Sequence, residues 1–103
     1  DVLRRAFGKS IAADWFEPRP DRFILREADI CDPEGDVFRM DRVVLDPGLV
    51  LVIDFKTGGR TEEAEAYREQ IRRYVRLLRD VHPGRPVRGF LSFVDRDRIE
   101  EVE

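Results

Sequence analysis

Apolar residues recur at helical spacing in two segments of the chain and form short runs, bounded by turn residues, in several others. A spacing of three and four residues is typical of an amphipathic helix, whereas a short run rich in β-branched and aromatic residues is typical of a strand. The order helix, three strands, helix, strand predicts an α/β domain with a mixed sheet flanked by helices. The pattern predicts helices over residues 2–16 and 62–80, and strands over residues 22–30, 37–46, 49–56, 87–94 and 99–102.

The segment from Leu49 to Lys56, LVLVIDFK, places a carboxylate and an ammonium at the end of an apolar run. Such a run is typical of a strand buried on both faces. A buried charge is costly unless another group neutralises it, so the two charges need an explanation. Because side chains alternate along a strand, Asp54 and Lys56 project from the same face. They either neutralise each other as an ion pair or belong to a functional site.

Asp41 lies in the preceding predicted strand, at a position that can face Asp54. If Pro47 and Gly48 form the centre of the hairpin, Asp41 and Asp54 are directly opposed. Opposed side chains in an antiparallel pair have Cβ atoms about 4.5–5.5 Å apart, and two like charges there are destabilising unless a cation lies between them. A longer loop between the strands could keep this alignment or break it.

Glu27, in the first predicted strand, could add a third carboxylate beside Asp41. Carboxylate oxygens are the ligands that suit Mg²⁺ or Mn²⁺. A metal ion held in this way can activate water and offset the charge of a phosphate under attack, and a nearby lysine can stabilise the same charge. A purely structural interpretation fits the same residues, because Asp54 can pair with Lys56 and Asp41 with Arg42 or another arginine.

Tyr67, Gln70 and Tyr74 form one stripe of the long predicted helix, at a spacing of three and four residues. Packing in the core, with the hydroxyl at its rim, is sufficient to explain the tyrosines. Gln70 is more informative, because an amide within an apolar stripe needs a hydrogen-bond partner. If this helix covers the acidic face, we expect Gln70 and Tyr74 to reach the metal site or a bound nucleic acid.

The composition is that of one small globular domain with a heavily charged surface: 103 residues, 42% hydrophobic and 40% charged. The net charge of −3 argues against wholesale electrostatic coating of nucleic acid. No apolar stretch approaches the roughly 20 residues that span a bilayer, so no membrane partner is expected. Cys31 is the only cysteine, which excludes a disulfide within the chain. Lys56 is one of only two lysines in an arginine-rich sequence.

Three segments together, FRMDRVVLD, VIDFKTG and YREQIRRY, resemble the motifs of the PD-(D/E)xK nuclease superfamily. The resemblance is closest to the RecB-type nuclease domain at the C-terminal end of bacterial recombination helicase-nucleases. It covers about residues 22–94 of a chain that we interpret as a single nuclease-like domain, residues 1–103, cut from a larger protein. It implies a restriction-endonuclease-like core, in agreement with the order of predicted elements.

The resemblance also implies a role for individual residues. Asp41 and Asp54 match the metal-binding aspartates, the main-chain carbonyl of Phe55 matches a further ligand, and Lys56 matches the catalytic lysine. Gln70 and Tyr74 match the element that supports the site and contacts DNA. We assign the looser positions accordingly: Glu27 to the metal, and Tyr67 and Arg42 to DNA.

The expected function is Mg²⁺- or Mn²⁺-dependent hydrolysis of DNA phosphodiester bonds, as the exonuclease module of a bacterial, cytoplasmic repair or recombination helicase-nuclease. Its partners would be single-stranded DNA or unwound duplex ends and the helicase domains. The alternative is a weakly active or inactive nuclease fold that binds DNA or docks a helicase. Relatives commonly supply a metal-binding histidine upstream, but no histidine precedes Asp41 here. We therefore expect the isolated piece to bind metal poorly and to show little activity.

Overall fold

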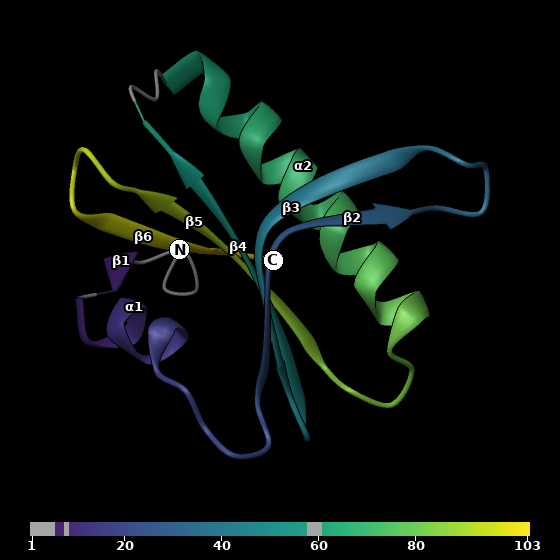
Figure 1. The fold of residues 1–103 in the computed structure, drawn as a ribbon. Coiled ribbons are helices and arrows are strands. Elements are labelled where there is room, and N and C mark those ends of the chain that lie inside the picture. Colours follow the sequence, from purple (N-terminus) through teal and green to yellow (C-terminus); the bar gives the residue numbers. More distant parts are fainter. Residues whose placement is uncertain (1–5, 8, 58–60) are drawn as a thin grey trace.

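The computed structural model describes residues 6–7, 9–57 and 61–103 and contains two helices and six strands in that part of the chain. All strands belong to one sheet, and Figure 1 shows how the helices lie against it. The elements are β1 (Ala6–Phe7), α1 (Lys9–Phe16), β2 (Phe23–Cys31), β3 (Val37–Asp46), β4 (Leu49–Lys56), α2 (Thr61–Val81), β5 (Val87–Phe93) and β6 (Arg98–Val102).

The predicted elements from residue 22 onward agree with the observed ones to within a residue or two at each end. The prediction of one helix over residues 2–16 is wrong at its beginning. Ala6 and Phe7 form a short strand that pairs antiparallel with Glu100 and Ile99 of β6, and the helix begins only at Lys9. Sheet pairing outweighs the helical spacing of these residues, and the predicted residues 2–5 and Gly8 lie outside the described part.

The strand order in the sheet is β1-β6-β5-β4-β3-β2. Only β4 and β5 are parallel, and α2 connects them as a crossover. The remaining neighbours are antiparallel, so the sheet is mixed as predicted. This topology places β4, the predicted site strand, near the centre of the sheet and α2 directly over one face.

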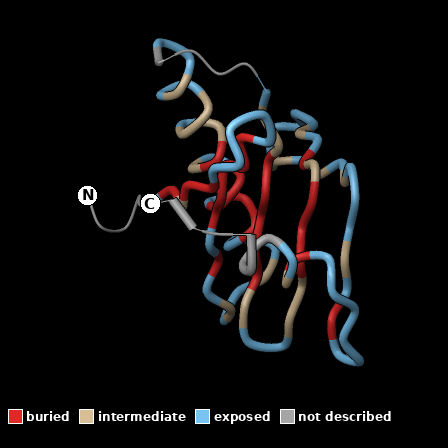
Figure 2. The backbone as a smooth tube through the Cα atoms, turned by 90° about the vertical axis from the view of Figure 1, so that its left-hand side faces the viewer, coloured by how far each residue is buried: buried red, intermediate tan, exposed pale blue. Residues whose placement is uncertain are grey.

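Hydrophobic residues form one layer on each face of the sheet. The larger layer packs against α2 and includes Val52, Ile71, Leu78 and Leu91, all fully buried. The smaller layer is on the side of α1, with Trp15 at its centre. Figure 2 shows that burial is concentrated in the central strands, whereas much of the β2–β3 hairpin is exposed. No described helix is both apolar enough and long enough to cross a membrane.

Gly89 in β5 allows α2 to approach the sheet closely. A Cβ atom at this position would lie 2.4 Å from Cγ2 of Ile71 and 2.9 Å from Cγ2 of Val75. Both helix side chains are buried and cannot move away easily. The absence of a side chain at Gly89 therefore sets the distance between α2 and the strands that it covers.

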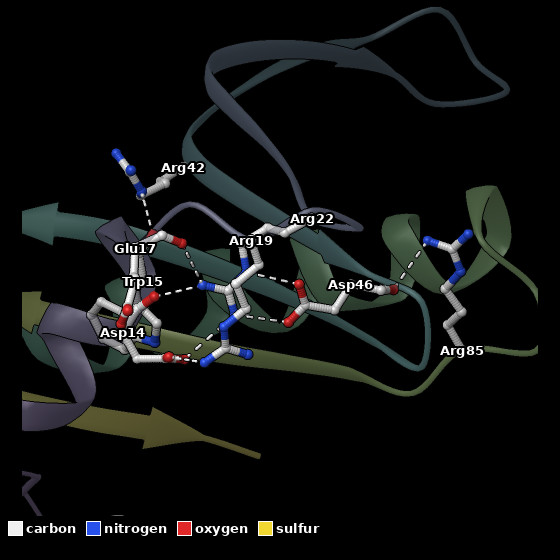
Figure 3. Close-up of polar contacts among 8 residues, drawn as sticks. All are labelled: Asp14, Trp15, Glu17, Arg19, Arg22, Arg42, Asp46 and Arg85. Atoms are coloured by element: carbon white, nitrogen blue, oxygen red, sulfur yellow. Dashed lines mark hydrogen bonds and ion pairs between the residues drawn. The ribbon is translucent and has the colours of Figure 1, made fainter.

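A buried guanidinium fastens the end of α1 to the β3–β4 turn (Figure 3). Nε of Arg22 donates to Oδ1 of Asp46 at 2.7 Å, and Nη2 donates to Oδ2 at 2.9 Å. Nη1 donates to the main-chain oxygens of Asp14, at 2.5 Å, and Glu17, at 3.1 Å. The hydrogen bonds from Arg22 lower the pKa of Asp46. This cluster therefore fixes the turn that sets the register of β3 and β4.

Candidate active site

The β3–β4 hairpin has the register that the Pro47–Gly48 turn predicts. Its pairs run from Asp46–Leu49 to Arg42–Ile53, so Asp41 and Asp54 are next in line. The regular ladder ends there, and Oδ2 of Asp41 accepts a hydrogen bond from the main-chain N–H of Phe55 at 2.9 Å. A carboxylate thus replaces a main-chain partner at the point where β3 leaves β4.

Glu27 marks the corresponding bend in β2. Arg26 pairs with Arg42 and Ala28 pairs with Met40, so Glu27 lies opposite Asp41 in the register. Its φ of 48° is a left-handed conformation that is uncommon for residues other than glycine. The prediction that Glu27 lies beside Asp41 is confirmed for the backbone. Its side chain is exposed, whereas that of Asp41 is partly buried.

Beyond this bend the β2–β3 hairpin curves across α2, as Figure 1 shows. The ring of Phe38 meets the ring of Tyr74 edge-on, with centroids 6.3 Å apart. The hydroxyl of Tyr74 donates to the main-chain oxygen of Arg39 at 3.2 Å. The hairpin and the helix therefore enclose the diverging ends of β3 and β4.

Asp54 is the most deeply buried charged group of the site, with 4% of its surface exposed. Burial, with a smaller contribution from Asp41, raises its pKa to about 6, although Lys56 opposes the shift. Nζ of Lys56 lies 2.7 Å from Oδ2 of Asp54. Oδ2 is the one buried side-chain oxygen or nitrogen of the described residues without a hydrogen bond. Charge attraction, rather than a directed bond, joins the pair.

Two side chains of α2 hold the Lys56 ammonium. It donates to Oε1 of Gln70 at 3.2 Å and lies 4.6 Å from the centroid of the Tyr67 ring. The prediction that Gln70 needs a polar partner is confirmed, and that partner is the lysine of the site. One carboxylate, one amide and one aromatic face therefore fix the direction of this cation.

The two tyrosine hydroxyls have partners of their own. Tyr67 donates to Oε2 of Glu63 at 2.7 Å, and this acceptor raises the pKa of Tyr67. Burial, followed by the charges of Asp54 and Asp41, raises the pKa of Tyr74 to about 12. Tyr74 therefore stays protonated and acts as a donor that ties the hairpin to α2.

Arg42 is the predicted site residue that the structure does not bring to the site. It is 6% exposed, its Nε donates to the main-chain oxygen of Trp15 at 3.2 Å, and its guanidinium carbon lies 4.1 Å from the Phe16 ring centroid. Neighbouring residues of a strand project to opposite faces, so Arg42 lies on the α1 side while Asp41 faces α2. The strand period alone could have shown this.

The donors at Asp41 and Asp54 fit a divalent cation of the magnesium type. Mg²⁺ is usually held by one or two carboxylates and keeps several waters, so a cluster of three protein carboxylates is not required. No group of three or more acidic, histidine or cysteine side chains that could hold a metal occurs among the described residues. Oδ2 of Asp54 has no hydrogen bond, although Nζ of Lys56 lies 2.7 Å away, and it is the oxygen that a metal ion would contact. Glu27 therefore does not add a third protein ligand to Asp41 and Asp54.

Two residues beside the site were not predicted. Phe38 and Arg73 line a groove next to Gln70, together with Ala66 and Glu69. Arg73 is one of several arginines on α2, so the sequence does not distinguish it from the others. The structure does so by placing it over the ring of Phe38. Its position three residues after Gln70 is the signal that the sequence does contain.

The arrangement is a small α/β domain, consistent with a restriction-endonuclease-like core. A solved structure that shares it is that of an XisH family protein from Nostoc punctiforme, with a TM-score of 0.51 and 13% sequence identity. The match covers 80% of this chain and 88% of that one. No protein-family model and no curated protein matches the sequence. The likeness therefore confirms the predicted fold class.

Proposed function

We propose that this chain is a metal-dependent deoxyribonuclease domain. Asp41, Asp54 and Lys56 form the site at which it would hydrolyse phosphodiester bonds. One observation carries the proposal. Where β3 and β4 diverge, the buried carboxylate of Asp54 lies beside the carboxylate of Asp41 and 2.7 Å from the oriented ammonium of Lys56. A purely structural strand end would gain nothing from this arrangement, since burial and the neighbouring Asp41 together raise the pKa of Asp54 to about 6 against the opposing effect of Lys56.

Asp41 and Asp54 would hold Mg²⁺ or Mn²⁺, with the main-chain carbonyl of Phe55 as a third oxygen donor. When bound, the ion would supply Lewis-acid polarisation of the phosphate and a more acidic water. Asp41 can serve as a metal ligand through Oδ1, because the Phe55 N–H holds Oδ2 in place. Asp54 can serve because its burial leaves the charged form in need of a cation.

Lys56 would stabilise the negative charge that develops on the phosphate during attack. A positioned ammonium is effective there because the surrounding protein is less polar than water. Gln70 and Tyr67 aim the ammonium, and neither competes for its charge as a second carboxylate would. Tyr74 supports the site indirectly, because its hydrogen bond joins α2 to the hairpin that carries Asp41.

We further propose, on the three sequence motifs alone, that this domain is the exonuclease module of a bacterial helicase-nuclease. DNA with an unpaired end would be its substrate, helicase domains would be its partners, and the cytoplasm would be its site of action. A parent chain without helicase sequence would remove this context but leave the hydrolytic site untouched.

The competing function is a nuclease fold that binds DNA without cleaving it. It is favoured by one observation: the described residues provide two carboxylates and no third acidic or histidine ligand. Incubation of the full parent protein with end-labelled single- and double-stranded DNA, with Mg²⁺ or Mn²⁺, separates the two. Hydrolysis that Asp54→Ala and Lys56→Ala both abolish supports the nuclease. Hydrolysis that survives both substitutions overturns it, and binding without hydrolysis supports the competitor.

A further inference from the structure

We infer that the groove between α2 and the β2–β3 hairpin binds one unpaired strand of nucleic acid, with Phe38 stacking on a base and Arg73 contacting a phosphate. We call it the hairpin groove; Phe38, Ala66, Glu69, Gln70 and Arg73 line it. The inference rests on the proposed function, because the groove would hold the part of the substrate that lies next to the cleaved phosphate.

The hairpin groove is joined directly to the site. Gln70 is part of its wall and also accepts the hydrogen bond from Nζ of Lys56. A strand whose scissile phosphate lies at Lys56 would therefore place the adjacent nucleotide in this groove.

In the part of the chain that the structure describes, two arginines of α2, Arg73 and Arg79, have no ion pair, and of these only Arg73 lines the hairpin groove. Arg68 is held by the buried carboxylate of Glu100, with Nε 2.6 Å from Oε2, and Arg72 is held by Glu65 and Glu69 at 2.9 Å each. Among the described residues, no carboxylate pairs with Arg73, whose guanidinium carbon lies 5.4 Å from the centroid of the Phe38 ring. Its charge is available to a ligand.

Glu69 also lines the groove but does not cancel this charge. One of its oxygens accepts from Nη1 of Arg72 at 2.9 Å, and the other lies 4.0 Å from Nη2 of Arg76. The carboxylate is thus directed along the helix toward two cations. An arginine without an acidic partner, above an aromatic ring, is the chemistry that binds a phosphate and a base together.

The aromatic ring favours an unpaired strand. A base within a duplex has both faces covered by its neighbours, whereas a single-stranded base is free to stack on a side chain. Phe38 is partly exposed, and it also lines the adjoining depression with Arg73. That depression is also lined by carboxylates that repel phosphate, so we expect the bound stretch to be short. These are Asp32, Glu34, Asp36 and Asp80.

The test measures binding instead of cleavage, in the full parent protein with Asp54→Asn to block hydrolysis and with Mg²⁺ present. Fluorescence anisotropy compares a labelled oligo-dT, an oligo-U of the same length and a duplex. In this background, Arg73→Ala should weaken binding of the single strands about five-fold or more and reduce the slope of log Kd against log salt by about 0.7. Arg79→Ala, which removes the same charge from an exposed position on the same helix, should change binding less than two-fold.

Phe38→Leu keeps an apolar side chain but removes the ring, and should weaken binding about five-fold or more. Phe38→Trp should retain binding, and the fluorescence of the new indole should fall when oligonucleotide is added. Preference for oligo-dT or oligo-U identifies the strand as DNA or RNA, and either supports the inference. Tighter binding of the duplex, absence of binding, or equal effects of Arg73→Ala and Arg79→Ala overturn it. These outcomes do not depend on hydrolysis, so the proposed function can fail or succeed separately.

Discussion

Replacing Asp54 by asparagine should make the metal-free protein more stable. The carboxylate is 4% exposed and its pKa is raised from 3.8 to about 6. One unit of pKa shift corresponds to about 1.4 kcal/mol, so the charged form costs about 3 kcal/mol of folding free energy well above pH 6. Asparagine removes that cost with nearly the same shape. It also removes the partner of Lys56, a loss of up to about 1 kcal/mol for a partly exposed pair. The pKa of about 6 already contains the effect of Lys56, so this loss is included in the cost of about 3 kcal/mol, and we expect a gain of about 2–3 kcal/mol.

The pH dependence gives this prediction its sign. The raised pKa means that the folded protein takes up a proton at Asp54 before the unfolded chain does. The destabilisation of the wild type is therefore complete above the folded-state pKa of about 6 and disappears as the pH falls toward 3.8. Asp46, whose pKa is lowered by Arg22, contributes stability that acid removes, but it does so in both proteins. The difference between variant and wild type isolates Asp54.

Urea unfolding in EDTA, followed by the fluorescence of the buried Trp15, measures this difference at pH 7.5 and at pH 4.5. The advantage of Asp54→Asn should be present at the higher pH and shrink at the lower one. Asp21→Asn, which removes an exposed carboxylate, should stay within about 0.5 kcal/mol of wild type. A variant that is no more stable than wild type at pH 7.5, or an advantage that does not change with pH, would refute the reasoning.

Two further substitutions test how the fold supports the site. Arg22→Ala should cost about 3 kcal/mol, because it leaves Asp46 partly buried and unpaired, and urea unfolding at neutral pH measures this loss. Gly89→Ala should cost about 1–3 kcal/mol, because the added Cβ would lie 2.4 Å from Cγ2 of Ile71, and thermal unfolding should show a lower midpoint.

Each substitution has a matched control. Arg19→Ala removes an arginine whose ion pair with Asp14 is exposed, and should cost less than about 1 kcal/mol. Gly48→Ala adds a Cβ that meets no atom within 4 Å, and should change stability by less than about 0.5 kcal/mol. If Arg22→Ala costs no more than its control, the buried cluster does not hold the turn. If Gly89→Ala matches Gly48→Ala, the helix can move away and the close approach is not needed.

Most of the sheet could be predicted because local sequence and tertiary packing agree there. The turn at Pro47 and Gly48 fixes the register of β3 and β4, and the register in turn brings Asp41 opposite Asp54. The apolar stripe of α2 predicted the helix face that covers them, and the lone amide in that stripe predicted a polar partner for Gln70.

The features that escaped prediction depend on contacts distant in sequence or on backbone conformation. Ala6 and Phe7 form a strand only because β6 offers them an edge. The left-handed conformation of Glu27 has no signature in a residue type that rarely adopts it. The charge of Arg73 stands out only after the structure shows which arginines of α2 are already paired and which of the others lines the groove. The prediction that Arg42 contacts DNA is a different case, because the alternation of side chains along β3 already places Arg42 on the face opposite that of Asp41.

The most direct test of the proposed site is the rate of hydrolysis of end-labelled single-stranded DNA by the full-length protein and its Asp54→Asn variant, side by side, with Mg²⁺. We expect cleavage by the wild type that EDTA abolishes. We expect none above background from the variant, even though it is folded and more stable than the wild type. Cleavage by Asp54→Asn at the wild-type rate would contradict the assignment of Asp54 to a metal-dependent nuclease site.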